Sequence, residues 1–386
     1  MLRLSRENVG VVALLLWGAA TGFIGLDWGL PSSARLRAFP ESLRPTPELA
    51  RQITDAWTRL YQGIEKTHKE LKTEEPVTYV QGVVRVPSGW TALPDALVNS
   101  YRSALLRTEN PDEQKSMLIL AHMRPWKLEF KPLYIQYGGA FIYALGAFLK
   151  AASLAGLVEL VPDLGHYLLA PGDMGGLFYY GRVFIVFFHV GSLWLLYGLG
   201  RRLAGPRVGL LAAVLFSLSP IAVANSHNLK PHPYAAFWCL AAARFMLAAF
   251  EGGKRRDYLV CGLCVGAAGG ANFSLACFGM LPFLAWAWRA RAGDARRREW
   301  REPLLAAAAA AGVFVLANPY AVFSFRDYLW EMTVYPGARD PLAWSTVWSF
   351  AGPGLTSALG TALYAAVAAG FVWSALSKDP RRRLLC

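Results

Sequence analysis

The sequence predicts an all-α membrane protein that crosses the bilayer many times. Of its 386 residues, 55% are hydrophobic and only 17% are charged, whereas a soluble domain usually carries about 25% charged residues. The mean hydropathy is +0.30, and apolar runs recur along most of the chain. Such runs bury their backbone polar groups in lipid only as helices or closed barrels. The repeated apolar runs therefore predict a polytopic helix bundle.

The net charge of +13 comes from short basic clusters beside apolar runs. This placement is typical of cytoplasmic loops under the positive-inside rule, so we expect membrane lipids as partners and no nucleic acid. The clusters lie at residues 201–202, 254–256, 296–298 and 381–383.

Residues 1–26 are expected to form the first transmembrane helix. Arg3 and Arg6 precede an apolar run at 9–26, which is long for a signal sequence and has no small-residue cleavage site after it. We expect this helix to be retained, with its N-terminus in the cytoplasm.

Residues 27–132 are expected to form a large, mostly helical extracytoplasmic loop, because they hold half of the 26 acidic residues. Thr46, Pro47 and Glu48 have the pattern of a helix start. An apolar stripe follows at Leu49, Ile53, Trp57, Leu60, Ile64 and Leu71. Two interpretations stay open: the helix lies along the membrane interface, with Trp57 and Tyr61 at headgroup depth, or its stripe packs on the rest of the loop.

The remainder of this loop contains shorter elements. We expect a short strand at 77–86, where β-branched residues are frequent, and a turn at 87–90. Helical segments are expected at 95–107 and 112–123.

Residues 133–386 are expected to form the transmembrane bundle, with about nine further segments. We place them at 133–150, 151–165, 178–200, 205–223, 235–252, 258–272, 274–290, 303–319 and 353–376. The segment at 151–165 is the weakest, but an odd number of crossings must separate an outer loop from the basic residues at 201–202. The total is about ten segments, with both termini cytoplasmic.

The sequence Asn110-Pro111-Asp112-Glu113 has two interpretations. Asn at a helix cap, Pro at the first position and acids in the first turn together form an ordinary helix start. A pair of carboxylates at a membrane edge is also a candidate acid–base site.

Cationic and polar side chains collect on the same expected outer face. They are Lys131, Arg182, Lys230, His232 and Asn272. A sugar carried on a lipid phosphate has an anionic leaving group, which such cations bind and stabilise, and a carboxylate removes the proton of the attacking group or holds a divalent cation. For His227 and His232 both a metal pair and ordinary loop positions stay open.

Eight short motifs follow one another along the chain. They are GLDWGLP at 25–31, PDE at 111–113, FKPLY at 130–134, GR at 181–182, YGLGRRL at 197–203, LSP at 218–220, SHNLKPH at 226–232 and NPY at 318–320. In order and spacing they resemble the motifs of the GT-C membrane glycosyltransferases. The likeness is to glycosyltransferase family 39, on the branch of the protein O-mannosyltransferases and the aminoarabinose–lipid A transferases.

The resemblance implies a GT-C-like helix bundle and assigns roles residue by residue. Asp112 is implied as the base or a metal or substrate contact with Glu113 in support, and Lys131 and Arg182 as contacts of the lipid phosphate. Lys230, His232 and Asn272 complete the expected donor-binding set. Many relatives have an acid where this chain has His232 and a lysine where it has Asn272, which leaves dependence on a divalent metal open, with Asp112 as the candidate ligand.

The expected function is transfer of a sugar from a polyprenyl-phosphate-linked donor to an extracytoplasmic lipid, glycan or protein. The enzyme is expected in the cytoplasmic (inner) membrane, with its active site on the extracytoplasmic face. The alternative is a non-catalytic lipid-binding or carrier protein, or an inactive truncated transferase. The C-terminal residues 379–386 have the pattern of an inner loop that opens into another apolar run, so a C-terminal truncation is expected.

Overall fold

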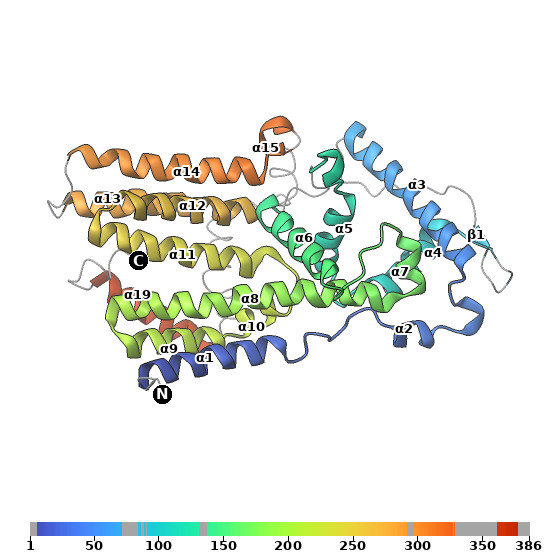
Figure 1. Cartoon of the computed structure of the whole chain (residues 1–386), viewed down its shortest axis with the longest axis horizontal. Helices are drawn as coiled ribbons and strands as arrows, with labels where there is room; N and C mark the ends of the chain where they lie inside the picture. Colours follow the sequence, from blue (N-terminus) through green and yellow to red (C-terminus); the bar gives the residue numbers. More distant parts are fainter. Residues whose placement is uncertain are drawn as a thin grey trace. The chain divides into compact units, whose positions relative to one another are not determined.

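The computed structural model describes residues 6–71, 84–85, 89, 91–130, 137–291, 297–326, 328 and 361–376. Helices dominate these residues (Figure 1), which confirms the predicted all-α class. Two short strands, β1 (Val84–Arg85) and β2 (Thr91–Ala92), form an antiparallel pair.

The chain divides into two compact units, which are described separately. The bundle unit contains Met1–Leu26, Leu118–Gly146 and Arg182–Cys386, and the insert unit contains Asp27–Met117 and Ala147–Gly181.

In the bundle unit, long helices lie side by side (Figure 1). Its members are α1 (Arg6–Phe23), α9 (Pro206–Ser217), α10 (Pro220–Ser226), α11 (Pro231–Gly252), α12 (Arg255–Ala271), α13 (Leu281–Arg291), α14 (Arg301–Ala317), α15 (Tyr320–Phe323) and α19 (Thr361–Leu376). The 3-10 helices η4 (Phe273–Met280) and η5 (Arg297–Trp300) precede α13 and α14, and α8 (Pro171–Ala204) contributes its residues from Arg182 onward.

Small residues bring α12 close to α14. A Cβ atom at Gly262 would lie 2.1 Å from the carbonyl oxygen of Ala306, and one at Gly266 would lie 2.5 Å from that of Ala310. Glycines four residues apart on one helix face let two backbones approach, as is common in membrane helix pairs. This pair is therefore held by close backbone packing.

Three helical stretches are long and apolar enough to cross a membrane. They are α8, α11 and Phe273–Arg291, and α9 with α10 forms a fourth candidate that is bent by 66°. Two shorter apolar helices occupy Asn8–Phe23 and Gly139–Leu154. In the part of the chain that the structure describes, length and composition thus support fewer crossings than the ten expected.

The expected segment at 151–165 is wrong. Helix α6 (Gly139–Leu154) ends there, since Gly156 has φ +73° and Leu157 N–H bonds back to Ala152 O at 2.9 Å. This left-handed glycine with its six-to-one bond is a Schellman C-cap. Residues 155–163 therefore form a loop, and the 353–360 part of the last expected segment lies outside the described residues.

The insert unit contains the expected helical segment at 95–107 and the first part of the one at 112–123, whose residues from Leu118 onward belong to the bundle unit. They appear as α4 (Pro94–Tyr101) with a π-helical turn η2 (Arg102–Leu106), and as α5 (Glu113–His122). The unit also contains α2 (Ser33–Ala38), the 3-10 helix η1 (Glu41–Leu43), α3 (Pro47–Leu71) and α7 (Leu164–Leu169). Of the expected strand and turn, residues 77–83, 86–88 and 90 lie outside the described residues.

The apolar stripe of α3 packs inside the insert unit. Leu49 and Ile53 are 2% and 0% exposed and share one core with Val98, Leu105 and Leu168. Trp57 packs against the same core, with the Arg102 guanidinium 3.7 Å above its ring. These side chains therefore pack within the loop, as the second of the two interpretations expects. The side chains of Leu60, Tyr61, Ile64 and Leu71 lie outside the described part of the structure.

A buried asparagine joins three helix ends in the bundle unit. The Asn318 side chain, just after α14, accepts from Gly139 N–H at 2.8 Å and from the Tyr320 hydroxyl at 2.6 Å. Its Nδ2 donates to Gly270 O at 3.1 Å, near the end of α12. Helix ends leave backbone groups unpaired, and this one amide satisfies groups at the start of α6 and the end of α12.

We predict that Asn318→Ala destabilises the protein by about 2–3 kcal/mol, because two buried backbone groups lose their partner. The measurement is the thermal unfolding midpoint of the purified chain in detergent. Asn99→Ala on the exposed face of α4 is the matched control and should leave the midpoint unchanged. Equal midpoints for both variants would contradict the assignment.

Candidate functional site

The chain just past α1 is held by a buried arginine of α8. Arg182 is 3% exposed, and its Nη1 donates to the carbonyl oxygen of Leu26 at 2.8 Å. A guanidinium has five N–H donors in a rigid fork, so this bond occupies one part of the group. The structure thus shows that Arg182, expected from the sequence as a phosphate contact, fixes the exit of the first helix.

His227, at the end of α10, contacts the same part of the chain just past α1. Its Nε2 lies 2.9 Å from Ile24 O, and its Nδ1 lies 2.8 Å from Val223 O. A neutral imidazole donates from one nitrogen only, so in either neutral tautomer one of the two contacts is a hydrogen bond. Because both ring nitrogens face backbone oxygens, the arrangement does not favour the metal pair of His227 with His232.

A cavity of about 470 Å³ lies among α8, α9, α10, α11 and α19. Most of its lining is apolar, with polar side chains supplied by His189, Ser192, Ser219, Asn225 and His232. This volume falls in the range of small-molecule pockets. His232, which the sequence analysis expects as a donor contact, therefore lines a cavity in the bundle unit.

Two polar groups at this cavity have no hydrogen-bond partner among the described residues. They are Nε2 of His189 and Oγ of Ser219, both on side chains that are at most 3% exposed. The His189 ring stacks on Phe216. Ser219 stands at the break between α9 and α10, where Pro220 starts the second helix. Unpaired polar groups are costly in such surroundings, which marks this break as a place of functional interest.

Lys230 and Asn272 both stand at helix boundaries. Lys230 is the half-buried residue that precedes α11, whose first residue is Pro231. The Oδ1 atom of Asn272 accepts from Ser274 N–H at 3.2 Å, so its side chain caps η4. Asn272 therefore has a local structural role beside the expected donor contact.

In the insert unit, Asp112 and Glu113 differ sharply in exposure. The side chain of Asp112 is 42% exposed and forms an ion pair with Lys115 at 3.3 Å, whereas Glu113 is 0% exposed. Asn110 Oδ1 accepts from Asp112 N–H at 3.1 Å, so the helix-start interpretation holds for the backbone. The carboxylate that meets solvent is Asp112.

Lys131 lies outside the described residues. Its neighbour Phe130 is described, and the carbonyl oxygen of Phe130 accepts a hydrogen bond from the Tyr143 hydroxyl of α6 at 3.1 Å. The expected role of Lys131 therefore stays a prediction from the sequence.

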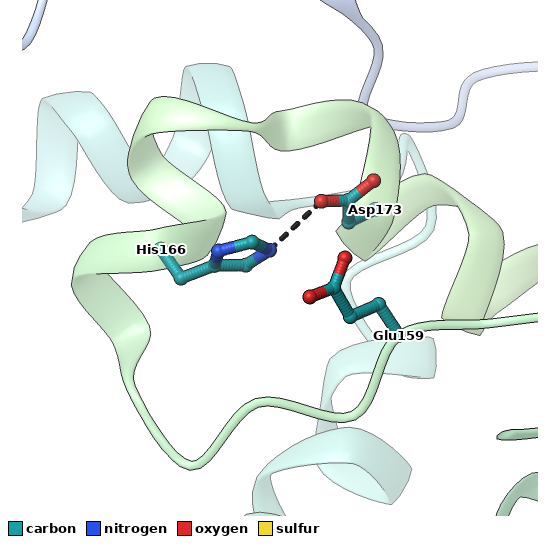
Figure 2. Close-up of side chains that lie close together, drawn as sticks. All are labelled: Glu159, His166 and Asp173. Carbon is teal, nitrogen blue, oxygen red and sulfur yellow. Dashed lines mark hydrogen bonds and ion pairs between the residues drawn. The ribbon is translucent and has the colours of Figure 1, made fainter.

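Sequence reasoning missed one cluster of ligand-bearing side chains in the insert unit: Glu159, His166 and Asp173 (Figure 2). Glu159 was assigned to the membrane segment at 151–165, which does not form. The available signal was the seven-residue spacing of His166 and Asp173 after a loop with Gly156 and Pro162.

Residues 178–323 match the family model described as dolichyl-phosphate-mannose-protein mannosyltransferase. The matched part is less than half of the chain, and it contains Arg182, Lys230, His232 and Asn272 but not Asp112, Glu113 or Lys131. The comparison with curated proteins gave no match, and neither did the comparison with solved structures. Together with the apolar helices, the family match supports a membrane glycosyltransferase in general.

We predict that Arg182→Met lowers the unfolding midpoint in detergent, because the buried carbonyl group of Leu26 loses its donor, at a cost of about 1–3 kcal/mol. Arg207→Met, on the exposed start of α9, is the control and should behave like the unsubstituted protein. A stable Arg182→Met variant would refute a role in fixing the exit of α1.

Proposed function

We propose that the chain transfers a sugar from a polyprenyl-phosphate-linked donor to an extracytoplasmic acceptor. The observation that carries this proposal is the match of residues 178–323 to a family named for dolichyl-phosphate-mannose and protein. Mannose is accordingly the first sugar to test, and protein is the first acceptor.

We propose that cationic side chains of the chain bind the phosphate of the donor. Cleavage of the glycosidic bond leaves negative charge on the lipid phosphate, and fixed Lys and Arg donors stabilise that charge most in a site of low dielectric. We assign Lys131 and Arg182 to the phosphate. Lys230, His232 and Asn272 are proposed as further donor contacts, and His232 is supported by its place in the lining of the cavity.

Asp112 is proposed as the general base that removes the proton of the acceptor. Its carboxylate is accessible, and its pair with Lys115 is partly exposed on both sides, so the pair is weak and readily exchanged. Buried Glu113 is proposed to position the turn.

The enzyme is proposed to lie in the cytoplasmic membrane, with Asp112 on the extracytoplasmic side. A second candidate function, lipid binding without catalysis, is favoured by the mostly apolar lining of the cavity. The two functions differ in turnover, since a binding protein retains the donor without consuming it.

We predict that Asp112→Asn lowers transfer from a radiolabelled polyprenyl-phosphate sugar by 100-fold or more, consistent with the typical gain of about 10²–10⁴ from general acid–base catalysis. The measurement is label transfer in membranes that contain equal amounts of each variant. Asp55→Asn, on the exposed face of α3, is the matched control and should retain full transfer.

Two outcomes would count against this assignment. Full transfer by the Asp112→Asn variant would remove the catalytic role. Saturable binding of polyprenyl phosphate without transfer from any sugar donor would instead establish the lipid-binding function.

A further inference from the structure

Glu159, His166 and Asp173 bring three potential ligand atoms within 4.8 Å of one another. His166 Nε2 lies 2.8 Å from Asp173 Oδ2. Figure 2 shows the carboxylate of Glu159 facing the same space from the neighbouring loop. The cluster offers one nitrogen and carboxylate oxygens from three separate chain segments.

Local structure fixes each segment independently of the cluster. Asp163 caps α7 by accepting from Gly165 N–H at 2.8 Å. The buried Tyr167 hydroxyl donates to Glu159 O and accepts from Val161 N–H, both at 3.0 Å. The loop that carries Glu159 is therefore tied to the helix that carries His166.

The two carboxylates are weakly compensated. No lysine or arginine in the described part of the chain forms an ion pair with Glu159 or Asp173, and His166 alone pairs with Asp173. A cation between these side chains would relieve this concentration of negative charge.

We propose that Glu159, His166 and Asp173 bind a divalent first-row transition metal ion of the Zn²⁺ type. Metal bonds of about 2.1 Å at the tetrahedral angle that Zn²⁺ prefers would place two neighbouring ligand atoms about 3.4 Å apart. The ion would therefore replace the hydrogen bond of 2.8 Å between His166 Nε2 and Asp173 Oδ2 and move the two atoms slightly apart. An imidazole beside carboxylates suits Zn²⁺ or Mn²⁺ better than Mg²⁺ or Ca²⁺, which prefer all-oxygen sites. Three protein ligands leave room for water.

The ion would clamp the loop after α6 to α7 and to the first turn of α8. The competing explanation is that His166 and Asp173 form an ion pair between α7 and α8, with Glu159 an unrelated surface acid. Both explanations predict that His166→Ala destabilises the protein. They differ at Glu159, which is exposed, so Glu159→Gln should preserve the fold and lower affinity only if a metal binds there.

The test uses the full chain in detergent, purified with an affinity tag that contains no histidine. Calorimetric titration with Zn²⁺ and the visible absorption of added Co²⁺ report binding without an activity assay. We expect one ion per chain and a metal-dependent rise in the unfolding midpoint. Affinity should fall about tenfold or more in Glu159→Gln and His166→Ala. His122→Ala, at the exposed end of α5, is the matched control for binding by a surface histidine.

Unchanged Zn²⁺ affinity in Glu159→Gln and His166→Ala would overturn the proposal, as would loss of binding in His122→Ala. Competition by millimolar Mg²⁺ or Ca²⁺ would also overturn the assignment to a transition metal. Circular dichroism of each metal-free variant separates loss of ligands from loss of the fold.

Discussion

Hydrogen bonds from buried and half-buried side chains to backbone groups at helix ends connect separate helices of the bundle unit. Asn318 joins the start of α6 to the end of α12, and Arg182 and His227 grip the chain that leaves α1. In an apolar medium an unpaired backbone group costs several kcal/mol, so a helix that ends inside the unit needs such partners. Polar side chains therefore face the places where helices stop, and Arg182, Lys230 and Asn272 of the candidate site are at or against such places.

Helices were predictable wherever an apolar run was long. The runs at 178–200 and 235–252 correspond to α8 and α11, because a long apolar run with few charges is the sequence pattern of a membrane helix. The failure at 151–165 has a local cause. Gly156, in the left-handed region, ends α6. The segment was predicted despite this glycine, because an odd number of crossings was required between the outer loop and the basic residues at 201–202. The α3 stripe shows another limit, since the same amphipathic pattern suits a membrane surface and a protein core.

The chemical types at the candidate site were predictable, but their environments were not. Asp112 and Glu113 are adjacent in sequence, yet one is accessible and the other fully buried, because successive residues of a helix point in different directions. Asn272 was expected as a donor contact, and its side chain caps a helix. The cluster of Glu159, His166 and Asp173 depends on a loop and two helix starts, and no local period encodes such a meeting.

The bond between Arg182 and Leu26 has a consequence for any anion that reaches this guanidinium. If Arg182 contacts the lipid phosphate as proposed, the same planar group serves both the chain leaving α1 and the incoming phosphate. Occupancy of one contact would then change the free energy of the other. Such thermodynamic linkage is reciprocal. If a change in conformation at the exit of the first helix altered the affinity for phosphate by some factor, phosphate binding would alter the equilibrium of that conformational change by the same factor. The conformation of the chain near Leu26 would then depend on whether the lipid phosphate is bound.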